Sequence, residues 1–169
     1  FGGTSVANVS RINNVANIVE NKVQNNKLIV VLSAMAGVTN EMQTYIDQIK
    51  SDSKLENDLI LTSGENVTIG ILSSILKKRL IKSIPLLGWQ VPIITDSNHQ
   101  KSKILNIDKK RILNFLKEYD VIVLAGFQGV DLDGHITSLG RGGSDTTAVA
   151  IASAINADRC DIYTDVDGV

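Results

Sequence analysis

The sequence contains a single cysteine, almost no net charge and no uninterrupted apolar run of bilayer-spanning length. One cysteine, Cys160, cannot form an internal disulfide, which fits a reducing cytoplasm. A formal charge of −1 at pH 7 gives no net electrostatic basis for binding nucleic acid or a membrane surface. A spanning helix needs about 20 apolar residues, and no secretory signal opens the chain. We therefore expect a cytoplasmic protein without a nucleic-acid or membrane partner.

The chain of 169 residues, 43% of them hydrophobic and 21% charged, is long enough to bury one core. No repeat, low-complexity tract or linker divides it, so we expect one layered domain. It begins at Phe1 without an initiator methionine and stops at "TDVDGV". Both ends look cut through an active segment, so we expect a fragment of a longer polypeptide.

Strands and helices are predicted to alternate along the chain. Alternation of this kind implies a three-layer αβα sandwich around a mostly parallel sheet. Strands are predicted from β-branched apolar runs at 28–34, 91–95, 120–129 and 160–164. Helices are predicted from apolar residues three and four apart at 10–23, 42–49, 59–84 (interrupted at Gly64-Glu65), 108–118 and from Ser144 onward.

Three polar, glycine-containing loops should meet at one edge of such a sheet, where ligands bind. They are "GGTS" at Gly2, "SAMAGVTN" at Ser33 and "GRGGSDTT" at Gly140. Helix N-termini carry unpaired amide donors and partial positive charge, which suit anions. The glycines of "GGTS" would let backbone amides approach a phosphate, although a tight turn alone would explain the same residues.

Arg141 and Glu65 are the most informative charged residues. A guanidinium group fits a carboxylate or phosphate in two parallel hydrogen bonds, unless Arg141 is simply exposed. Glu65 lies in the apolar segment "LILTSGENV", where a charge is costly unless it is paired. Either a substrate ammonium group or an internal Arg or Lys would be a suitable partner.

Two further acidic positions allow a functional and an ordinary interpretation. Asp145 in a first helical turn could be only a partner of the helix dipole. Thr164 and Asp165 follow a predicted strand, which suits a nucleotide or metal contact but also an ordinary turn.

The motifs together resemble those of the aspartokinases, in the amino-acid kinase superfamily. "FGGTS", "VLSAMAGVTN", "SGE", "GFQG", "SLGRGGSDTTAVAIA" and "CDIYTDVDGV" occur in the family's order and approximate spacing, across essentially the whole chain. The resemblance implies a truncated amino-acid kinase (carbamate kinase-like) fold. It also implies phosphorylation of the L-aspartate side-chain carboxylate by ATP with Mg²⁺, giving 4-phospho-L-aspartate. That reaction is the first step toward lysine, threonine, methionine and diaminopimelate, and family members are usually homo-oligomers.

The resemblance also assigns roles to individual residues. Arg141 corresponds to the residue that binds the α-carboxylate of aspartate, and Glu65 to the residue that pairs with its ammonium group. Asp145 is placed with both the substrate and the catalytic residues. The remaining positions are Ser33, Thr39, Phe127 and Ser144 in the aspartate pocket, Gly2, Gly3, Thr4 and Ser5 in the phosphate-side loop, and Thr164 and Asp165 with Gly2, Gly3 and Ser5 at the nucleotide.

The implied chemistry needs no general base, because a carboxylate with an ordinary pKa near 3.9 is already ionised at neutral pH. None of the motifs contains a histidine; His99 and His135 are interpreted as surface or turn residues. The family's lysine before "FGGTS", the rest of its ATP site and its ACT domains are not in this sequence, so we expect impaired activity from the fragment. Two alternatives stay open: another kinase of the same fold, acting on glutamate or a nucleotide, and a non-catalytic aspartate-binding module.

Overall fold

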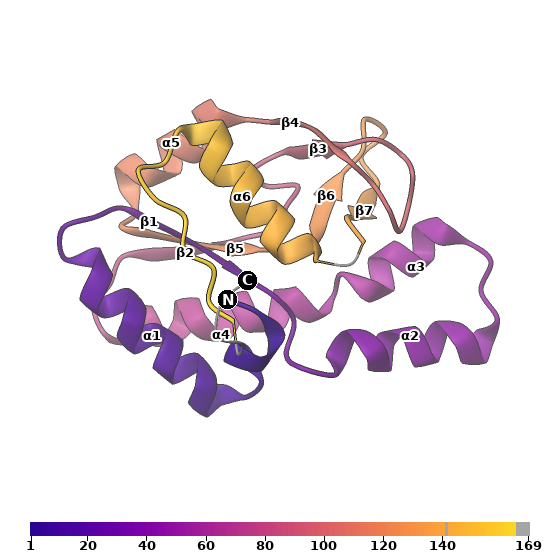
Figure 1. The fold of residues 1–169 in the computed structure, drawn as a ribbon, viewed down its shortest axis with the longest axis horizontal. Helices are drawn as coiled ribbons and strands as arrows, with labels where there is room; N and C mark the ends of the chain where they lie inside the picture. The colour runs from indigo at the N-terminus through magenta and orange to yellow at the C-terminus, as the bar shows by residue number, and fades with distance from the viewer. Residues whose placement is uncertain (141, 165–169) are drawn as a thin grey trace.

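A parallel three-stranded sheet forms the centre of the fold in the computed structural model, which describes residues 1–140 and 142–164 (Figure 1). Strand β5 (Val121–Ala125) lies between β1 (Leu28–Leu32) and β2 (Ser83–Leu86) and is parallel to both. All of β5 is buried, as expected for an apolar run covered on both faces.

Helices cover both faces of this sheet and give the expected three layers (Figure 1). Side chains alternate along β5: Val121 and Val123 pack toward one helical layer, whereas Ile122 and Leu124 pack toward the other. The first layer consists of α1 (Val9–Val23) and α4 (Gly64–Lys78), and the second of α5 (Lys109–Glu118) and α6 (Gly143–Ile155).

A second sheet and a helical hairpin extend the fold beyond the central layers (Figure 1). In this second sheet only the β3–β6 pair is parallel, so the expected parallel arrangement describes the central sheet alone. Its strands run in the order β4 (Ile104–Ile107), β3 (Ile93–Thr95), β6 (Gln128–Val130) and β7 (Ile136–Ser138). The remaining elements are a 3-10 helix η1 (Gly3–Val6) and the hairpin of α2 (Val38–Ile49) and α3 (Lys54–Leu61).

Two local expectations were wrong. The helix expected over 59–84 ends at Lys78, and Ser83 and Ile84 belong to strand β2. Residues 160–164 form no strand, and Cys160 is exposed. This segment instead contacts the start of the chain, where the rings of Phe1 and Tyr163 stack with centroids 4.3 Å apart. The segment 160–164 therefore packs against the start of the chain instead of joining a sheet.

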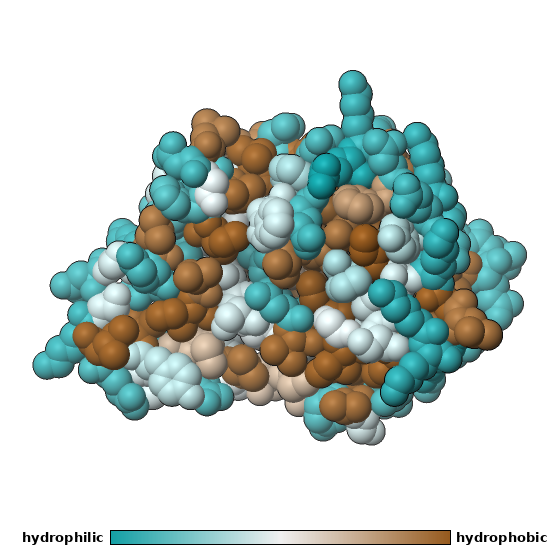
Figure 2. Space-filling view, turned by 180° about the vertical axis from the view of Figure 1, so that it is seen from behind, coloured by the Kyte–Doolittle hydropathy of each residue, from teal (hydrophilic) through white to brown (hydrophobic). Residues whose placement is uncertain are grey.

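The apolar segment Lys54–Lys78 is long enough to cross a membrane by length and composition alone, unlike our expectation for this chain. In the fold it comprises two helices, α3 and α4, with a turn at 62–63 between them. Half of its most apolar window is buried, and α4 packs against α1 and the central sheet. Some apolar side chains stay exposed on this layer, including Val67, and Figure 2 shows apolar patches interrupted by hydrophilic residues on one face of the molecule.

Leu72 of α4 has no exposed surface and belongs to the cluster between α1, α4 and the sheet. We expect Leu72→Ala to lower the free energy of unfolding by about 2–5 kcal/mol, because it leaves a cavity among residues that cannot fully collapse. Leu80→Ala is the matched control, since Leu80 is 94% exposed. Urea titrations should separate the two variants, and equal unfolding midpoints would contradict this description of the core.

Candidate active site

A large cleft of about 1840 Å³ opens beside the carboxyl ends of β1 and β5. The three glycine-containing loops expected at this edge all line it: Gly2 and Gly3, the segment from Ser33 to Gly37, and the segments on both sides of position 141. The α2–α3 hairpin and residues 100–104 form its other walls. The cleft therefore collects segments from both halves of the chain.

The first two loops are held together by their backbones. Ala36 donates its amide to the carbonyl of Gly3 at 3.2 Å, and Ser33 donates to the carbonyl of Phe1 at 3.2 Å. A Cβ at Gly3 would lie only 3.1 Å from the carbonyl oxygen of Ala34, so the close approach favours glycine there.

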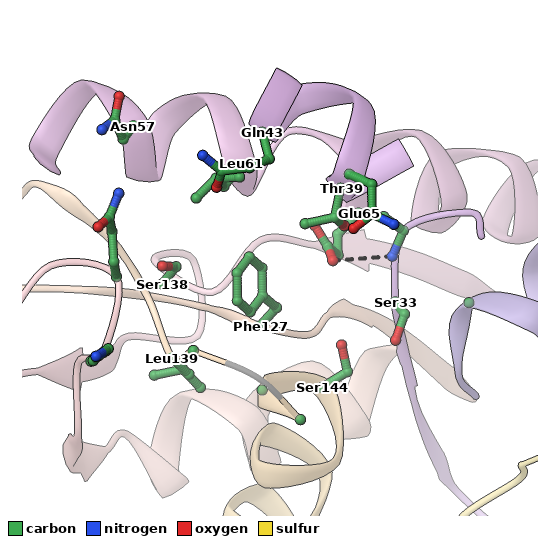
Figure 3. Close-up of a pocket in the computed structure, with 18 of the residues that line it drawn as sticks. Ser33, Thr39, Gln43, Asn57, Leu61, Glu65, Phe127, Ser138, Leu139 and Ser144 are labelled. Carbon is green, nitrogen blue, oxygen red and sulfur yellow. Dashed lines mark hydrogen bonds between the residues drawn. The ribbon is translucent and has the colours of Figure 1, made fainter. Parts of the chain in front are cut away.

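Glu65, in the first turn of α4, is a buried carboxyl group at the wall of this cleft (Figure 3). Its Oε1 accepts a hydrogen bond from the Ala34 amide at 3.0 Å, whereas its Oε2 has no partner among the described residues. Desolvation by burial raises the pKa of Glu65 to about 7, opposed by the hydrogen bonds from the backbone. Within residues 1–140 and 142–164 no Arg or Lys pairs with it, so an internal salt bridge to those residues is excluded.

Gly64 explains how Glu65 comes so close to the loop after β1. A Cβ at Gly64 would lie 2.6 Å from Cβ of Ala34 and 3.0 Å from Cγ1 of Val38. The missing side chain lets the start of α4 press against that loop, which brings the Glu65 carboxyl to the Ala34 amide.

Phe127 lies between the two sides of the cleft, in the two-residue connection from β5 to β6 (Figure 3). Its backbone is left-handed, with φ of 67°, which is uncommon for a bulky residue. Two hydrogen bonds hold this conformation: the Phe127 amide donates to Oγ1 of Thr147 at 3.1 Å, and Leu139 donates to its carbonyl at 2.9 Å. A backbone held away from its preferred conformation beside a cleft indicates a functional constraint.

The start of α6 closes the cleft opposite Glu65, and glycines again permit the contact. A Cβ at Gly126 would lie 2.7 Å from Oγ of Ser144, and one at Gly143 would lie 2.7 Å from the Phe127 ring. Ser144 and Asp145 of the first turn line the cleft, where the helix N-terminus presents backbone amides.

The structure brings together most of the predicted site residues. Thr4, Ser5 and Thr164 do not line the cleft, although the Gly2 amide donates to the carbonyl of Tyr163 at 3.4 Å and so places the end of the described chain beside the first loop. Arg141 and Asp165 lie outside the described residues, and Gly140 and Gly142, on either side of Arg141, both line the cleft. The predicted residues that do line it are Gly2, Gly3, Ser33, Thr39, Glu65, Phe127, Ser144 and Asp145.

Sequence reasoning missed a buried polar network behind the cleft wall. Nδ1 of His99 lies 2.7 Å from Oδ2 of Asp58, which has no exposed side-chain surface. His99 lies in a turn, which was one of the two expected settings, but it is partly buried and hydrogen-bonded and so is not a free surface residue. No sequence signal marked Asp58 as buried, because it ends the polar run 51–58 and the apolar stretch begins only after it.

The model of the amino acid kinase family matches residues 1–169. The chain belongs to this family. Among curated relatives, an aspartokinase of Geobacillus stearothermophilus is 49% identical over the whole chain, and an aspartate kinase of Pseudomonas putida is 52% identical. The chain spans 42% of the length of each of these two relatives.

Solved structures agree with this assignment and confirm the expected amino acid kinase fold. Escherichia coli aspartokinase III in complex with aspartate and ADP has a TM-score of 0.84 at 26% identity, covering 99% of this chain and 48% of that one. An aspartate kinase from Synechocystis has a TM-score of 0.82 at 41% identity, covering 98% of this chain and 28% of that one.

Glu65 should make the stability of this amino acid kinase chain depend on pH. The folded protein binds the Glu65 proton more tightly than the unfolded chain, because burial raises its pKa from 4.5 to about 7. The free energy of unfolding should therefore fall as pH rises through that interval, by about 3 kcal/mol from this group, and level off above it.

Glu65→Gln keeps the shape without the charge, so it should remove this dependence and exceed the wild type in stability at pH 8. Urea titrations from pH 4.5 to 8 without ligand measure the effect as the difference between the two proteins. If that difference does not change with pH, the Glu65 carboxyl titrates as an ordinary exposed one.

Proposed function

We propose that this chain is part of an aspartate kinase that transfers the γ-phosphoryl group of ATP to the side-chain carboxylate of L-aspartate. One observation carries the proposal: Oε2 of Glu65 is buried beside the cleft without a partner among the described residues. A buried carboxylate oxygen without a donor needs one, and an ammonium group supplies both the proton and the charge. The similarity to aspartokinases over the whole chain selects an amino acid as the source of that ammonium group.

Aspartate is proposed to lie between Glu65 and the start of α6. Its ammonium group would contact Oε2 of Glu65, and the hydroxyl groups of Ser33, Thr39 and Ser144 surround the same space (Figure 3). Arg141 would hold the α-carboxylate, as the resemblance implies, from the loop between Gly140 and Gly142. Phe127 would set the width of the pocket.

ATP is proposed to bind on the side formed by Gly2 and Gly3, with Mg²⁺ entering on its phosphate groups. The space beside Gly2 would admit a phosphate group, since a Cβ there would meet nothing closer than the Tyr163 carbonyl oxygen at 4.0 Å. Thr4, Ser5, Thr164 and Asp165 would complete the nucleotide side. Asp145 lies in the first turn of α6 and is the described acidic residue nearest in sequence to Arg141.

The reaction would proceed by positioning and charge stabilisation. A side-chain carboxylate oxygen of aspartate attacks the γ-phosphorus in line, its new bond to phosphorus forms as the bond from phosphorus to the bridging oxygen breaks, and ADP leaves. No proton has to be removed from the nucleophile, because it is ionised at neutral pH. The residues proposed here bind and orient; none acts as a base.

The complete protein is further proposed to act in the cytoplasm as a homo-oligomer, in the biosynthesis of lysine, threonine, methionine or diaminopimelate. The decisive assay supplies the complete polypeptide with ATP, Mg²⁺ and either aspartate, glutamate or uridylate, and follows ADP release and acyl phosphate trapping by hydroxylamine. Turnover with aspartate, but with neither glutamate nor uridylate, supports the proposal. Turnover with glutamate or uridylate instead would replace it with another kinase of this fold, and aspartate binding without turnover would indicate a non-catalytic module.

Glu65→Gln should raise the KM for aspartate at least about 10-fold, because loss of one partner in a desolvated charge pair costs about 2–5 kcal/mol. The KM for ATP should change by less than about twofold. Glu118→Gln is the control, since Glu118 is exposed at the end of α5. Steady-state kinetics at pH 8 give both constants, and equal increases for the two substrates would contradict the assigned role.

Arg141→Ala should likewise raise the KM for aspartate with a smaller effect on ATP. Arg141→Lys separates charge from shape, because an ammonium group cannot make the two parallel hydrogen bonds of a guanidinium group. We expect lysine to recover only part of the lost affinity. Full recovery by lysine would indicate a general electrostatic role in place of a carboxylate grip.

A further inference from the structure

Asp58 of α3 is a buried acid that does not line the cleft, yet it contacts two of the segments that do. Its side chain has no exposed surface. Oδ1 accepts a hydrogen bond from Oγ of Ser138 at 2.6 Å, and the Gln100 amide donates to both carboxylate oxygens at 3.1 and 3.2 Å. Nδ1 of His99 completes the set at 2.7 Å from Oδ2.

These contacts join three segments that are distant in the sequence. Asp58 belongs to α3, Gln100 to the loop between β3 and β4, and Ser138 to the end of β7. Each segment also contributes to the cleft wall, through Asn57 and Leu61 of α3, residues 100–104, and Ser138 itself. One carboxylate therefore ties together three parts of the wall from behind.

The loop held in this way has a backbone conformation that needs support. Gln100 is left-handed, with φ of 69°, which is uncommon for a residue other than glycine. Its carbonyl oxygen would lie 3.4 Å from a Cβ at Gly140, and the Ser102 amide donates to the Ser138 carbonyl at 3.0 Å. The Asp58 carboxylate therefore holds the Gln100 backbone, against which Gly140 packs.

The same loop is held from its other side by Asp131. Nε2 of His99 lies 3.9 Å from Oδ2 of Asp131, whose Oδ1 accepts the amides of Asp133 and His135 at 3.1 and 2.8 Å. His99 thus lies between two buried carboxylates, one in α3 and one directly after β6. Among the described residues, no Arg or Lys forms an ion pair with Asp58, so its charge is stabilised by directional donors that define positions.

We propose that Asp58 is a positioning residue for the aspartate side of the cleft: it holds the loop at Gln100 and the end of β7 so that Gly140 and the start of α6 lie at the correct distance from Glu65. The inference rests on the proposed function. It adds a residue that touches no substrate and acts through the segments carrying the binding groups.

The test uses the complete polypeptide with Asp58→Asn, Ser138→Ala and Ser138→Thr. Asparagine keeps the shape of Asp58 but removes its charge and replaces one accepting oxygen with an amide nitrogen. In either orientation that nitrogen cannot accept a hydrogen bond, so the network loses either the contacts of Oδ2 with Gln100 and His99 or those of Oδ1 with Gln100 and Ser138. We expect Asp58→Asn to raise the KM for aspartate about 10-fold and that for ATP by less than about twofold, which corresponds to about 1.4 kcal/mol of selective loss. Asp133→Asn is the matched control, because Asp133 is exposed.

A merely structural role predicts a different pattern. A destabilised protein loses active molecules, which lowers kcat for both substrates and leaves both KM values unchanged. The serine pair gives a second route if Asp58→Asn folds poorly: Ser138→Ala should raise the KM for aspartate, and Ser138→Thr, which keeps the hydroxyl group, should restore it.

Hydrogen exchange without substrate tests, independently of turnover, whether Asp58 holds the loop at Gln100 and the end of β7. Peptides covering 97–104 and 138–140 should exchange faster in Asp58→Asn than in the wild type, whereas Asp133→Asn should leave 138–140 unchanged. Unchanged exchange in Asp58→Asn, or unchanged KM for aspartate in an active variant, would overturn the inference. A wild type that turns over no aspartate would instead overturn the proposed function. Faster exchange in Asp58→Asn would then still show that Asp58 holds these two segments, without a role in that reaction.

Discussion

The site depends on one hydrogen bond, from the Ala34 amide to Oε1 of Glu65. It fixes one carboxylate oxygen and leaves the other buried beside the cleft without a partner among the described residues. Burying the charged Glu65 carboxylate without a partner lowers the stability of the fold. The same desolvation raises the pKa of Glu65 to about 7. The fold tolerates this cost because α4 is anchored by apolar packing along its length and by the close contact of Gly64 with Ala34.

Glycines at the other walls of the cleft have the same purpose as Gly64. At Gly3, Gly126 and Gly143 an added Cβ would lie 2.7–3.1 Å from a neighbouring atom. In each case one element approaches another more closely than any side chain would permit. The glycine density of these loops, which reads in the sequence as a sacrifice of stability for backbone shape, is explained in the structure by contact between elements as well as by access for a ligand.

The layered fold and the meeting of three loops could be predicted from the sequence, because long apolar runs such as 120–129 and glycine clusters are local signals. In the second sheet the predicted strand at 91–95 contains β3, but the sheet as a whole could not be predicted, since its strands are only three or four residues long and depend on partners distant in the chain. The role of Asp58 was hidden for a related reason: its partners Gln100 and Ser138 lie 42 and 80 positions away. The residues 160–164 looked like a strand because composition does not reveal whether a sheet has room for another member.

The central position of β5 affects how the chain acquires its structure. Both of its neighbours, β1 and β2, precede it in the sequence, so neither can form its parallel pairing until residues near 125 have been synthesised. Pairing between such distant strands is slow, and until then two apolar strand edges remain uncovered. On a ribosome, the first hundred residues would therefore carry exposed sheet edges that a chaperone could recognise.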